Sequence, residues 1–394
     1  MTKICVIGNF SGRNAGDAAI LGGLLHDISS RYPDCQYLIP TIKPGFITQA
    51  YKNHNVIPVG LLPWNLSIKI LGLPILRSIL ASDLVLITDA ILFDYKLMNP
   101  LYNYLFTLSF VLPLAKSRKI PVVLYNVSLG PVYSDMGKTC LRRVLESSDL
   151  ILLRDAESVK LLENLGLNYF SDIMFNAADC ALNTIPSNKQ RLNEICNKED
   201  ILRGDMSWVS FNISSYIDVY VRGYKGRGIG KEKFLNLIAE VIDMMIENLS
   251  VSVVLVITQP MDLQIANQLL AKLKNQRFIK LISNREYTYQ DIASVFSSVE
   301  IHVGMRTHSL ILASSVLTPV VGIIATPKNR GYMCSIEQDD RMVEFKNMTV
   351  DSLYTVIRST WDDRRTIRAE LGPIIGREKK KASSSADYLK QYMN

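Results

Sequence analysis

The sequence has little of what metal sites and disulfide frameworks need. Only four histidines and six cysteines occur in 394 residues, and no two cysteines have the C-x-x-C spacing of a zinc or redox site. A D-x-D motif is also missing, which argues against an enzyme that binds its substrate through a metal ion. We therefore expect no metal ion and no cofactor. Scattered cysteines in apolar surroundings are typical of free thiols in a reducing compartment, so we expect a cytoplasmic protein.

Long apolar runs and dense charge are missing as well. The longest apolar stretch, residues 101–115, is shorter than a membrane span and contains Asn103 and Pro113. The net charge of +7 is too modest for a nucleic-acid binder, although it suits an anionic substrate or membrane surface. The start, MTKICVIGNF, predicts a strand running into glycine and no signal peptide.

Residues 60–80 form a second apolar stretch, with Trp64, Lys69 and Arg77 interspersed. We interpret both stretches as buried or domain-edge helices. The alternative is a surface that rests on the inner face of the membrane, a peripheral contact that matters if the substrate carries a lipid.

Strand-like and helix-like segments alternate along the chain. Short apolar runs, each followed by polar or helical sequence, lie at residues 3–8, 36–42, 83–88, 121–130 and 149–155. The alternation begins again at residue 207, after a polar stretch. This pattern predicts an α/β fold with two Rossmann-like domains, each with a parallel sheet covered by helices. We expect the domains to face a cleft, because ligands of such folds bind beyond the carboxyl ends of the strands.

The composition suggests where the domains end. We place an N-terminal Rossmann-like domain at residues 1–185 and a linker at 186–205, where polar residues dominate. A C-terminal Rossmann-like domain follows at 206–348, and C-terminal helices and a tail occupy 349–394.

A glycine-rich loop, GNFSGRNAGDAAIL, follows the first predicted strand. Gly8, Gly12 and Gly16 are four residues apart, so the loop matches neither a dinucleotide-binding motif nor a P-loop. Backbone N–H groups at such a turn could bind a phosphate or frame a sugar. Alternatively, the loop is only a tight turn in which Asn14 or Asp17 caps the next helix. The loop by itself leaves both interpretations open.

Arg154 stands at the end of a predicted strand, in the segment LLRDAES. A guanidinium there can bind a carboxylate or a phosphate through two parallel hydrogen bonds. The alternative is a salt bridge to Asp155 or Glu157. We expect Asp155 to cap the following helix.

The segment GMRTHSLILASSVL places Arg306 and His308 in the first turn of a predicted helix. A helix start attracts anions, and histidine exchanges a proton readily near neutral pH. A lone histidine is more often structural, and we assign His302, in the middle of a strand, to that class. His308 has the arginine, the helix start and the strand end together. Lys328 follows the next strand, so we expect it to face the same cleft. The alternative is that it is an ordinary solvated lysine in a loop.

These motifs, taken in order, resemble those of the polysaccharide pyruvyl transferase family. The glycine loop ends in the family's Gly-Asp-x-x-Ile-Leu, and Arg306 and His308 match its Arg-x-His signature. Lys328 lies where the family often has a lysine. Three further segments match in order, NVSLGP (126–131), LLRDAES (152–158) and AADCAL (177–182). Together the landmarks span residues 3 to about 332.

The resemblance implies a two-domain fold like that of the GT-B glycosyltransferases. It also implies transfer of pyruvate from phosphoenolpyruvate to a sugar of a polysaccharide or lipid-linked precursor, forming a cyclic ketal. The N-terminal domain would hold the glycan or glycolipid acceptor and the C-terminal domain the donor. Arg154 and Arg306 would grip the donor's carboxylate and phosphate, and His308, as imidazolium, would protonate its methylene carbon. The binding residues would also include Gly12, Asn14, Gly16, Asp17 and Lys328.

One turn departs from the family, and two other functions stay open. Residues 88–90 are Thr-Asp-Ala where the family commonly has three glycines, which leaves the acceptor open. A sugar-nucleotide glycosyltransferase of the same fold is one rival. Such enzymes usually place a carboxylate after the helix start that here holds Arg306 and His308, but residues 307–322 contain none. The other rival is a non-catalytic protein that binds glycan or takes part in an assembly.

Overall fold

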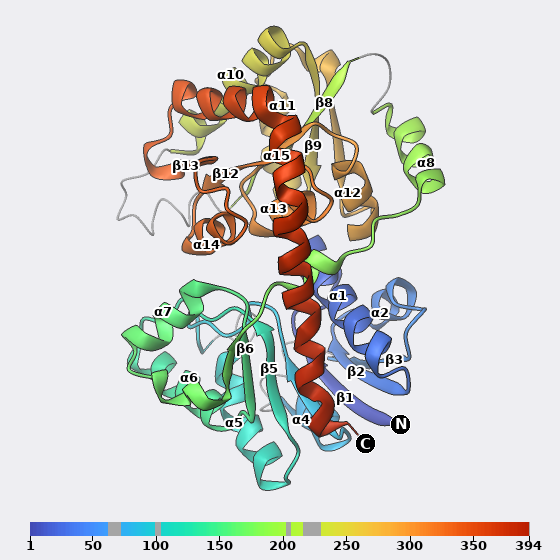
Figure 1. The fold of residues 1–394 in the computed structure, drawn as a ribbon, viewed down its shortest axis with the longest axis vertical. Coiled ribbons are helices and arrows are strands. Elements are labelled where there is room, and N and C mark those ends of the chain that lie inside the picture. The colour runs from blue at the N-terminus through green and yellow to red at the C-terminus, as the bar shows by residue number, and fades with distance from the viewer. Residues whose placement is uncertain (62–71, 99–103, 202–205, 216–229, 394) are drawn as a thin grey trace. The chain divides into compact units, whose positions relative to one another are not determined.

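The structure is a computed structural model that describes residues 1–61, 72–98, 104–201, 206–215 and 230–393. The chain divides into two compact units. The N-terminal unit comprises residues 1–12, 17–183 and 379–394, and the C-terminal unit comprises 13–16 and 184–378. Each unit is built around one parallel sheet with helices on both faces (Figure 1). The predicted fold class, α/β with two Rossmann-like domains, is confirmed.

The sheet of the N-terminal unit has seven parallel strands in the order β3-β2-β1-β4-β5-β6-β7. Central strands such as β4 are continuous apolar runs and wholly buried, as expected for a parallel sheet covered on both faces. The strands are β1 (Thr2–Ile7), β2 (Cys35–Thr41), β3 (Val56–Gly60), β4 (Leu84–Ile87), β5 (Val122–Val127), β6 (Leu150–Leu153) and β7 (Met174–Asn176).

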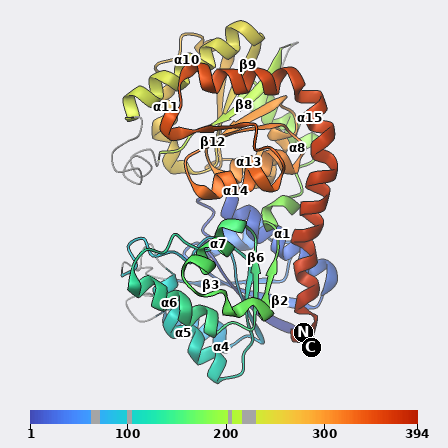
Figure 2. The same cartoon turned by 60° about the vertical axis from the view of Figure 1, so that its left-hand side comes forward.

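Strand order decides which face each helix of this unit covers. The chain moves one way across the sheet from β1 to β3 and the other way from β4 to β7, and right-handed crossovers then place the helices on opposite faces. Helices α4, α5 and α6 accordingly lie together on one face (Figures 1 and 2). The helices are α1 (Ala15–Arg31), α2 (Pro44–Ala50), α4 (Leu73–Leu80), α5 (Leu105–Ser117), α6 (Asp135–Glu146), α7 (Ala156–Asn164), and the short η1 (Asn168–Ile173), η2 (Cys180–Asn183) and η6 (Ser385–Tyr392).

The sheet of the C-terminal unit has six parallel strands in the order β10-β9-β8-β11-β12-β13. The order reverses direction between β8 and β11, which is where such folds bind ligands. The strands are β8 (Ser207–Asn212), β9 (Val251–Ile257), β10 (Ile279–Ser283), β11 (Ile301–Gly304), β12 (Val320–Ile324) and β13 (Met342–Glu344).

The C-terminal unit's helices follow its strands. They are α8 (Lys189–Glu199), α10 (Lys231–Leu249), α11 (Leu263–Leu270), α12 (Tyr289–Phe296), α13 (Thr307–Ser315), α14 (Pro327–Ser335) and α15 (Val350–Ser384), with the short η3 (Pro260–Asp262), η4 (Gln276–Phe278) and η5 (Phe345–Asn347). Helix α15 continues into the N-terminal unit after residue 378. The stretch 186–205, where the sequence places the linker, contains α8; residues 202–205 lie outside the described part.

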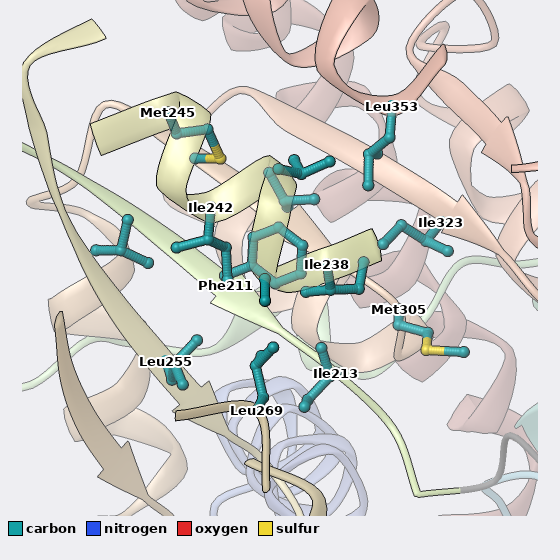
Figure 3. Packing of buried hydrophobic residues seen from close by; sticks show 14 of the residues in the cluster. Phe211, Ile213, Ile238, Ile242, Met245, Leu255, Leu269, Met305, Ile323 and Leu353 are labelled. Atoms are coloured by element: carbon teal, nitrogen blue, oxygen red, sulfur yellow. The ribbon is translucent and has the colours of Figure 1, made fainter. Parts of the chain in front are cut away.

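The core of the C-terminal unit forms where α10 packs on the sheet (Figure 3). Helix α10 presents Ile238, Ile242 and Met245, at helical spacing, toward Phe211 and Leu255 from the strands. All five side chains are fully buried. This packing holds the strand ends, and with them the loops that carry polar side chains.

The two apolar stretches noted in the sequence are described only in part, because residues 62–71 and 99–103 lie outside the described ranges. Most of their described residues lie in α4 and α5. Within the described residues, no helix has both the length and the apolar content needed to cross a bilayer.

Candidate functional site

Polar side chains gather at the carboxyl ends of the central strands of the C-terminal unit. Asn212 is the last residue of β8, Arg306 follows β11, and Lys328 is the second residue of α14, after β12. β11 pairs with both β8 and β12, so these three ends are neighbours. The reversal of strand order between β8 and β11 lies within this group.

Arg306 is fixed by a buried carboxylate. Its Nη2 donates to Oδ1 of Asp262 at 2.8 Å and its Nε donates to Oδ2. The Asp262 side chain is fully buried, and that of Arg306 is 13% exposed. Asp262 also accepts from the backbone N–H of Ser215 at 2.7 Å. Two parallel bonds orient a guanidinium closely, and because Asp262 compensates its charge, Arg306 acts here as an oriented donor.

Two buried amides hold the backbone around Arg306. Asn212 Oδ1 accepts from the backbone N–H of Arg306 at 3.1 Å, and its Nδ2 donates to the carbonyl of Val256 at 2.7 Å. Asn329 Nδ2 donates to the carbonyl of Met305 at 2.8 Å. Both amides are nearly inaccessible to solvent. They satisfy backbone groups at the strand ends and set where helix α13 begins.

The starts of α13 and α14 lie beside each other. Thr307 Oγ1 lies 3.3 Å from Asn329 Oδ1, which joins the first turns of the two helices. Arg306 occupies the N-cap position of α13, and among the described residues no side chain caps that helix end. Thr326 caps α14. Two adjacent helix starts and half-buried Lys328 form an electropositive region suited to an anion.

His308 packs against the glycine loop. A Cβ atom placed on Gly16 would lie 2.2 Å from Cγ of His308, so no residue other than glycine fits there without moving the ring. Residues 13–16 belong to the C-terminal unit, and the backbone N–H of Ala15 donates to the carbonyl of Thr258 at 2.9 Å. Asn14 accepts from the N–H of Gly16 at 2.9 Å and caps α1, as one interpretation of the loop predicted. Residues 13–16 of the loop therefore meet the Arg-x-His segment within the C-terminal unit.

Gly12 and Asp17 belong to the N-terminal unit. Gly12 has a φ of +70°, and a Cβ there would lie 2.6 Å from the Phe46 ring, so both backbone and space require glycine. Asp17 is buried and accepts from Nδ2 of Asn9 at 3.1 Å. These contacts tighten the turn after β1.

Arg154, also in the N-terminal unit, lies in an acidic setting. Its Nη1 is 2.8 Å from Oδ2 of Asp179, and the two side chains are 8% and 5% exposed. Burial lowers the pKa of Arg154, but the carboxylates of Asp179, Asp89 and Asp155 outweigh burial and raise its pKa above the ordinary value.

The salt bridge of Arg154 has a different partner from the two considered in the sequence. Asp155 instead caps α7, as expected, accepting from the N–H of Ser158 at 2.7 Å. Glu157 pairs with Lys160. The carboxylates adjacent in sequence are taken by their own helix, so a residue that follows the neighbouring strand β7, Asp179, reaches the guanidinium.

His302 is the structural histidine that we expected. It is fully buried, its Nδ1 lies 2.8 Å from Oγ of Ser210, and its ring packs on Phe296. Burial lowers the pKa of His302 to about 3, partly opposed by the Ser210 bond. The ring is therefore neutral at physiological pH.

Sequence reasoning missed Asp262, Asn212 and Asn329. A signal existed for Asn212, since an apolar strand in each unit has an asparagine at or next to its last residue, in LYNVS and in SFNIS. Asp262 follows β9 through the short η3 helix, and nothing in its local sequence links it to Arg306. Within the described residues, no group of three or more His, Cys, Asp or Glu side chains could hold a metal ion.

Five of the eight predicted site residues lie in the C-terminal unit, namely Asn14, Gly16, Arg306, His308 and Lys328. Gly16 contacts His308, and Lys328 stands next in sequence to Asn329, which joins the two helix starts. Arg154, Gly12 and Asp17 belong to the other unit. A common site for Arg154 and Arg306 stays a prediction.

Solved structures share this fold over nearly the whole chain. The Anabaena protein HepE, solved with UDP-glucose, has 13% identity, a TM-score of 0.64 and 99% coverage of both chains. UDP-GlcNAc 2-epimerase from Methanocaldococcus jannaschii has 13% identity, a TM-score of 0.67 and 99% coverage of both chains. The enzyme from Neisseria meningitidis, bound to UDP-GlcNAc, has 11% identity, a TM-score of 0.65, and coverage of 100% of this chain and 99% of its own.

Identities this low establish the fold alone, which is of the GT-B type, as the family resemblance implied. No curated protein matches the chain. The family described as polysaccharide pyruvyl transferase matches residues 14–325, a span that holds Arg154, Arg306 and His308. The chain therefore belongs to the polysaccharide pyruvyl transferase family.

Proposed function

We propose that this protein transfers pyruvate from phosphoenolpyruvate to a sugar of a polysaccharide or a lipid-linked glycan precursor and forms a pyruvate ketal. Family membership supports pyruvyl transfer. The observation that carries the choice of donor is the start of α13, where a helix end without a side-chain cap, an oriented Arg306 and His308 come together. This combination suits a small, doubly anionic donor with a carbon to be protonated.

Donor binding follows from charge. Phosphoenolpyruvate carries a phosphate and a carboxylate close together. Lys328 and the starts of α13 and α14 supply positive potential, and Arg306 supplies oriented hydrogen bonds, because Asp262 compensates its charge. For Arg154 we propose a role as a second ligand of the donor's anionic groups, as the family resemblance implies.

The chemistry needs one acid and no metal. His308, as imidazolium, gives its proton to the methylene carbon, which becomes the methyl group of pyruvate, and the adjacent carbon becomes electrophilic. One sugar hydroxyl adds to that carbon, the carbon–oxygen bond to phosphate breaks, and a second hydroxyl closes the ketal. Each hydroxyl loses its proton; one of these protons restores the imidazolium, and the other leaves on the departing phosphate. A proton transfer of this kind contributes roughly 10²–10⁴-fold.

Gly16 keeps the acid in place. Because the His308 ring packs where a Cβ atom would otherwise lie, its side chain has a defined position. A positioned acid is effective, whereas a displacement of about 1 Å can cost about 10²-fold in rate. The glycine loop thus has a proposed role even if it touches no substrate.

The direct test is an assay of phosphate release. The protein is incubated with phosphoenolpyruvate and candidate glycan or glycolipid acceptors, without added metal. We expect phosphate release that is abolished by His308→Ala. The matched control is His26→Ala, since His26 is exposed on α1. A loss of less than about tenfold in His308→Ala would contradict the general-acid role.

A sugar-nucleotide glycosyltransferase is the second candidate, because HepE shares the fold and was solved with UDP-glucose. The same assay with sugar nucleotides distinguishes the two, since a glycosyltransferase would release nucleotide. Residues 307–322, which comprise α13 and the segment after it, contain no carboxylate that could hold a ribose. This favours phosphoenolpyruvate as the donor. If neither product forms while glycan still binds, the protein is a glycan-binding component.

A further inference from the structure

Exposed apolar side chains are concentrated on one region of the N-terminal unit. Of the large apolar side chains that are exposed in the described residues, eight lie on α4–α6 and the adjoining loops: Leu73, Leu80, Tyr95, Met98, Phe110, Leu114, Tyr133 and Met136. In the described part of the C-terminal unit only Ile185 and Met261 are in this group. Exposed apolar side chains gathered on one group of helices indicate an interaction surface more often than single scattered ones do.

Helix α5 shows the effect most clearly. One side of it buries Leu105, Leu108 and Leu112 against the sheet. The opposite side, where a surface helix normally carries polar residues, exposes Phe110 at 43% and Leu114 at 49%. Packing against α4 and α6, its neighbours, leaves these two side chains uncovered.

Basic residues lie near Phe110 and Leu114. Lys116, Arg118 and Lys119 are exposed at the end of α5, and Arg142 and Arg143 are exposed on α6. The Arg143 guanidinium lies 5.7 Å from the centre of the Phe110 ring. Lys116 Nζ donates to the backbone carbonyl of Glu146. The side chain of Glu146 is exposed and carries a negative charge in the same region.

A groove of about 460 Å³ runs between α5 and α6. Its lining combines Phe110 and Pro113 with the cations Lys116 and Arg143, the carboxylate of Glu146, and two serines. Apolar side chains together with two cations against one carboxylate suit a phospholipid, whose headgroup is anionic and whose chains are apolar.

We propose that the exposed face of α4–α6, centred on Phe110 and Leu114, docks on a bilayer that contains anionic lipids. Apolar side chains would enter the boundary between headgroups and acyl chains while the cations contact headgroup phosphates. A second copy of this chain fits less well, because a symmetric contact would bring like charges together. A nucleic acid would engage the cations but would leave Phe110 and Leu114 exposed. The inference does not rest on the proposed activity.

Sedimentation with lipid vesicles tests this surface on the full chain. Vesicles of phosphatidylcholine alone are compared with vesicles of equal parts phosphatidylcholine and phosphatidylglycerol, at low and at high salt. We expect binding to the anionic vesicles only, weakened by salt. Phe110→Ser with Leu114→Ser, and separately Arg142→Gln with Arg143→Gln, should each reduce binding by about tenfold or more.

Matched variants on the C-terminal unit control for general effects. Ile185→Ser with Met261→Ser removes exposed apolar groups there, and Arg277→Gln with Arg365→Gln removes exposed cations. Both should bind vesicles as the unmodified protein does. Circular dichroism checks folding, and if the apolar double variant does not fold, the arginine pair decides.

Three results would overturn the proposal. The first is that the protein does not bind anionic vesicles at low salt. The second is that the control variants lose as much vesicle binding as the α5–α6 variants. The third is that vesicles are not bound while light scattering shows a dimer that only the α5–α6 variants dissociate. The last result would assign the face to a second copy of the chain. Catalytic activity is measured separately, so failure here leaves the proposed function intact.

Discussion

The two units solve the same local problem differently. Each has a strand followed by an arginine that pairs with a buried aspartate, Arg154 with Asp179 and Arg306 with Asp262. In the N-terminal unit, Asp155 occupies the following helix start with its own carboxylate. In the C-terminal unit, Arg306 itself stands at the helix start, and no described side chain caps α13. One helix end is thus already occupied by an anion, whereas the other is suited to receive one from a ligand.

We expect the largest loss of stability when the ion pair between Arg306 and Asp262 is broken. Asp262→Asn leaves Arg306 without its carboxylate, and breaking a buried pair in this way costs about 3–5 kcal/mol in the free energy of unfolding. Urea denaturation measures it. Asp179→Asn should cost less, because Asp89 and Asp155 also act on Arg154. If both variants lose the same free energy of unfolding, Asp89 and Asp155 do not compensate for the loss of the Asp179 carboxylate.

The units should also respond to pH in opposite directions. Burial raises the pKa of Asp27 in the N-terminal unit to about 6, against a lowering by the Asn183 hydrogen bond and by His26 and Arg31. The stability that Asp27 contributes is fully present below about pH 4 and is lost as the pH rises through about 6. Asp27→Asn should therefore remove a pH dependence of about 3 kcal/mol.

In the C-terminal unit the sign is reversed, because the pKa of His302 is lowered to about 3. Stability from His302 is present above the ordinary histidine value and is lost as pH falls toward 3. Urea titrations at several pH values, with Asp27→Asn as the matched variant, separate the two contributions. If the stability of Asp27→Asn varies between pH 4 and 7 just as that of the unmodified protein does, the raised pKa of Asp27 is contradicted.

The glycines of the shared loop sharpen the comparison further. Gly16→Ala would force the His308 ring to move, so we expect about a 10²-fold loss of phosphate release. Gly12→Ala, in the other unit, meets the Phe46 ring and a positive φ, and should lower the free energy of unfolding measured with urea. Gly45→Ala, which meets nothing within 4 Å, is the neutral control.

The smallest effect is expected for the side chain at the start of α14. Lys328→Ala removes one positive charge from the electropositive region, and we expect KM for phosphoenolpyruvate to rise about tenfold with little change in kcat. The exposed Lys233→Ala on α10 serves as the control. If kcat falls and KM does not change, Lys328 acts in the chemical step instead of in donor binding.

Much of the site's local structure could be predicted. The strand before Arg306, the helix after it, the capping role of Asp155 and the structural role of His302 all follow from short segments. The partners of the two arginines could not be predicted, because Asp179 and Asp262 are reached through other strands of the sheet. Charge pairing adjacent in sequence suggested Asp155 or Glu157, and both are engaged by their own helix.

The sequence by itself determined two parallel α/β units and which residues stand at the strand ends, because apolar periodicity and glycine-rich turns act over a few residues. Tertiary structure decided which of those residues meet. Gly16 contacts His308, and Asp262 holds Arg306, because parallel strands order themselves in a sheet by crossovers, which bring distant segments to the same edge. It also decided that Phe110 and Leu114 stay exposed, since the helix periodicity of α5 has apolar residues on both sides and only packing against the sheet selects the buried one.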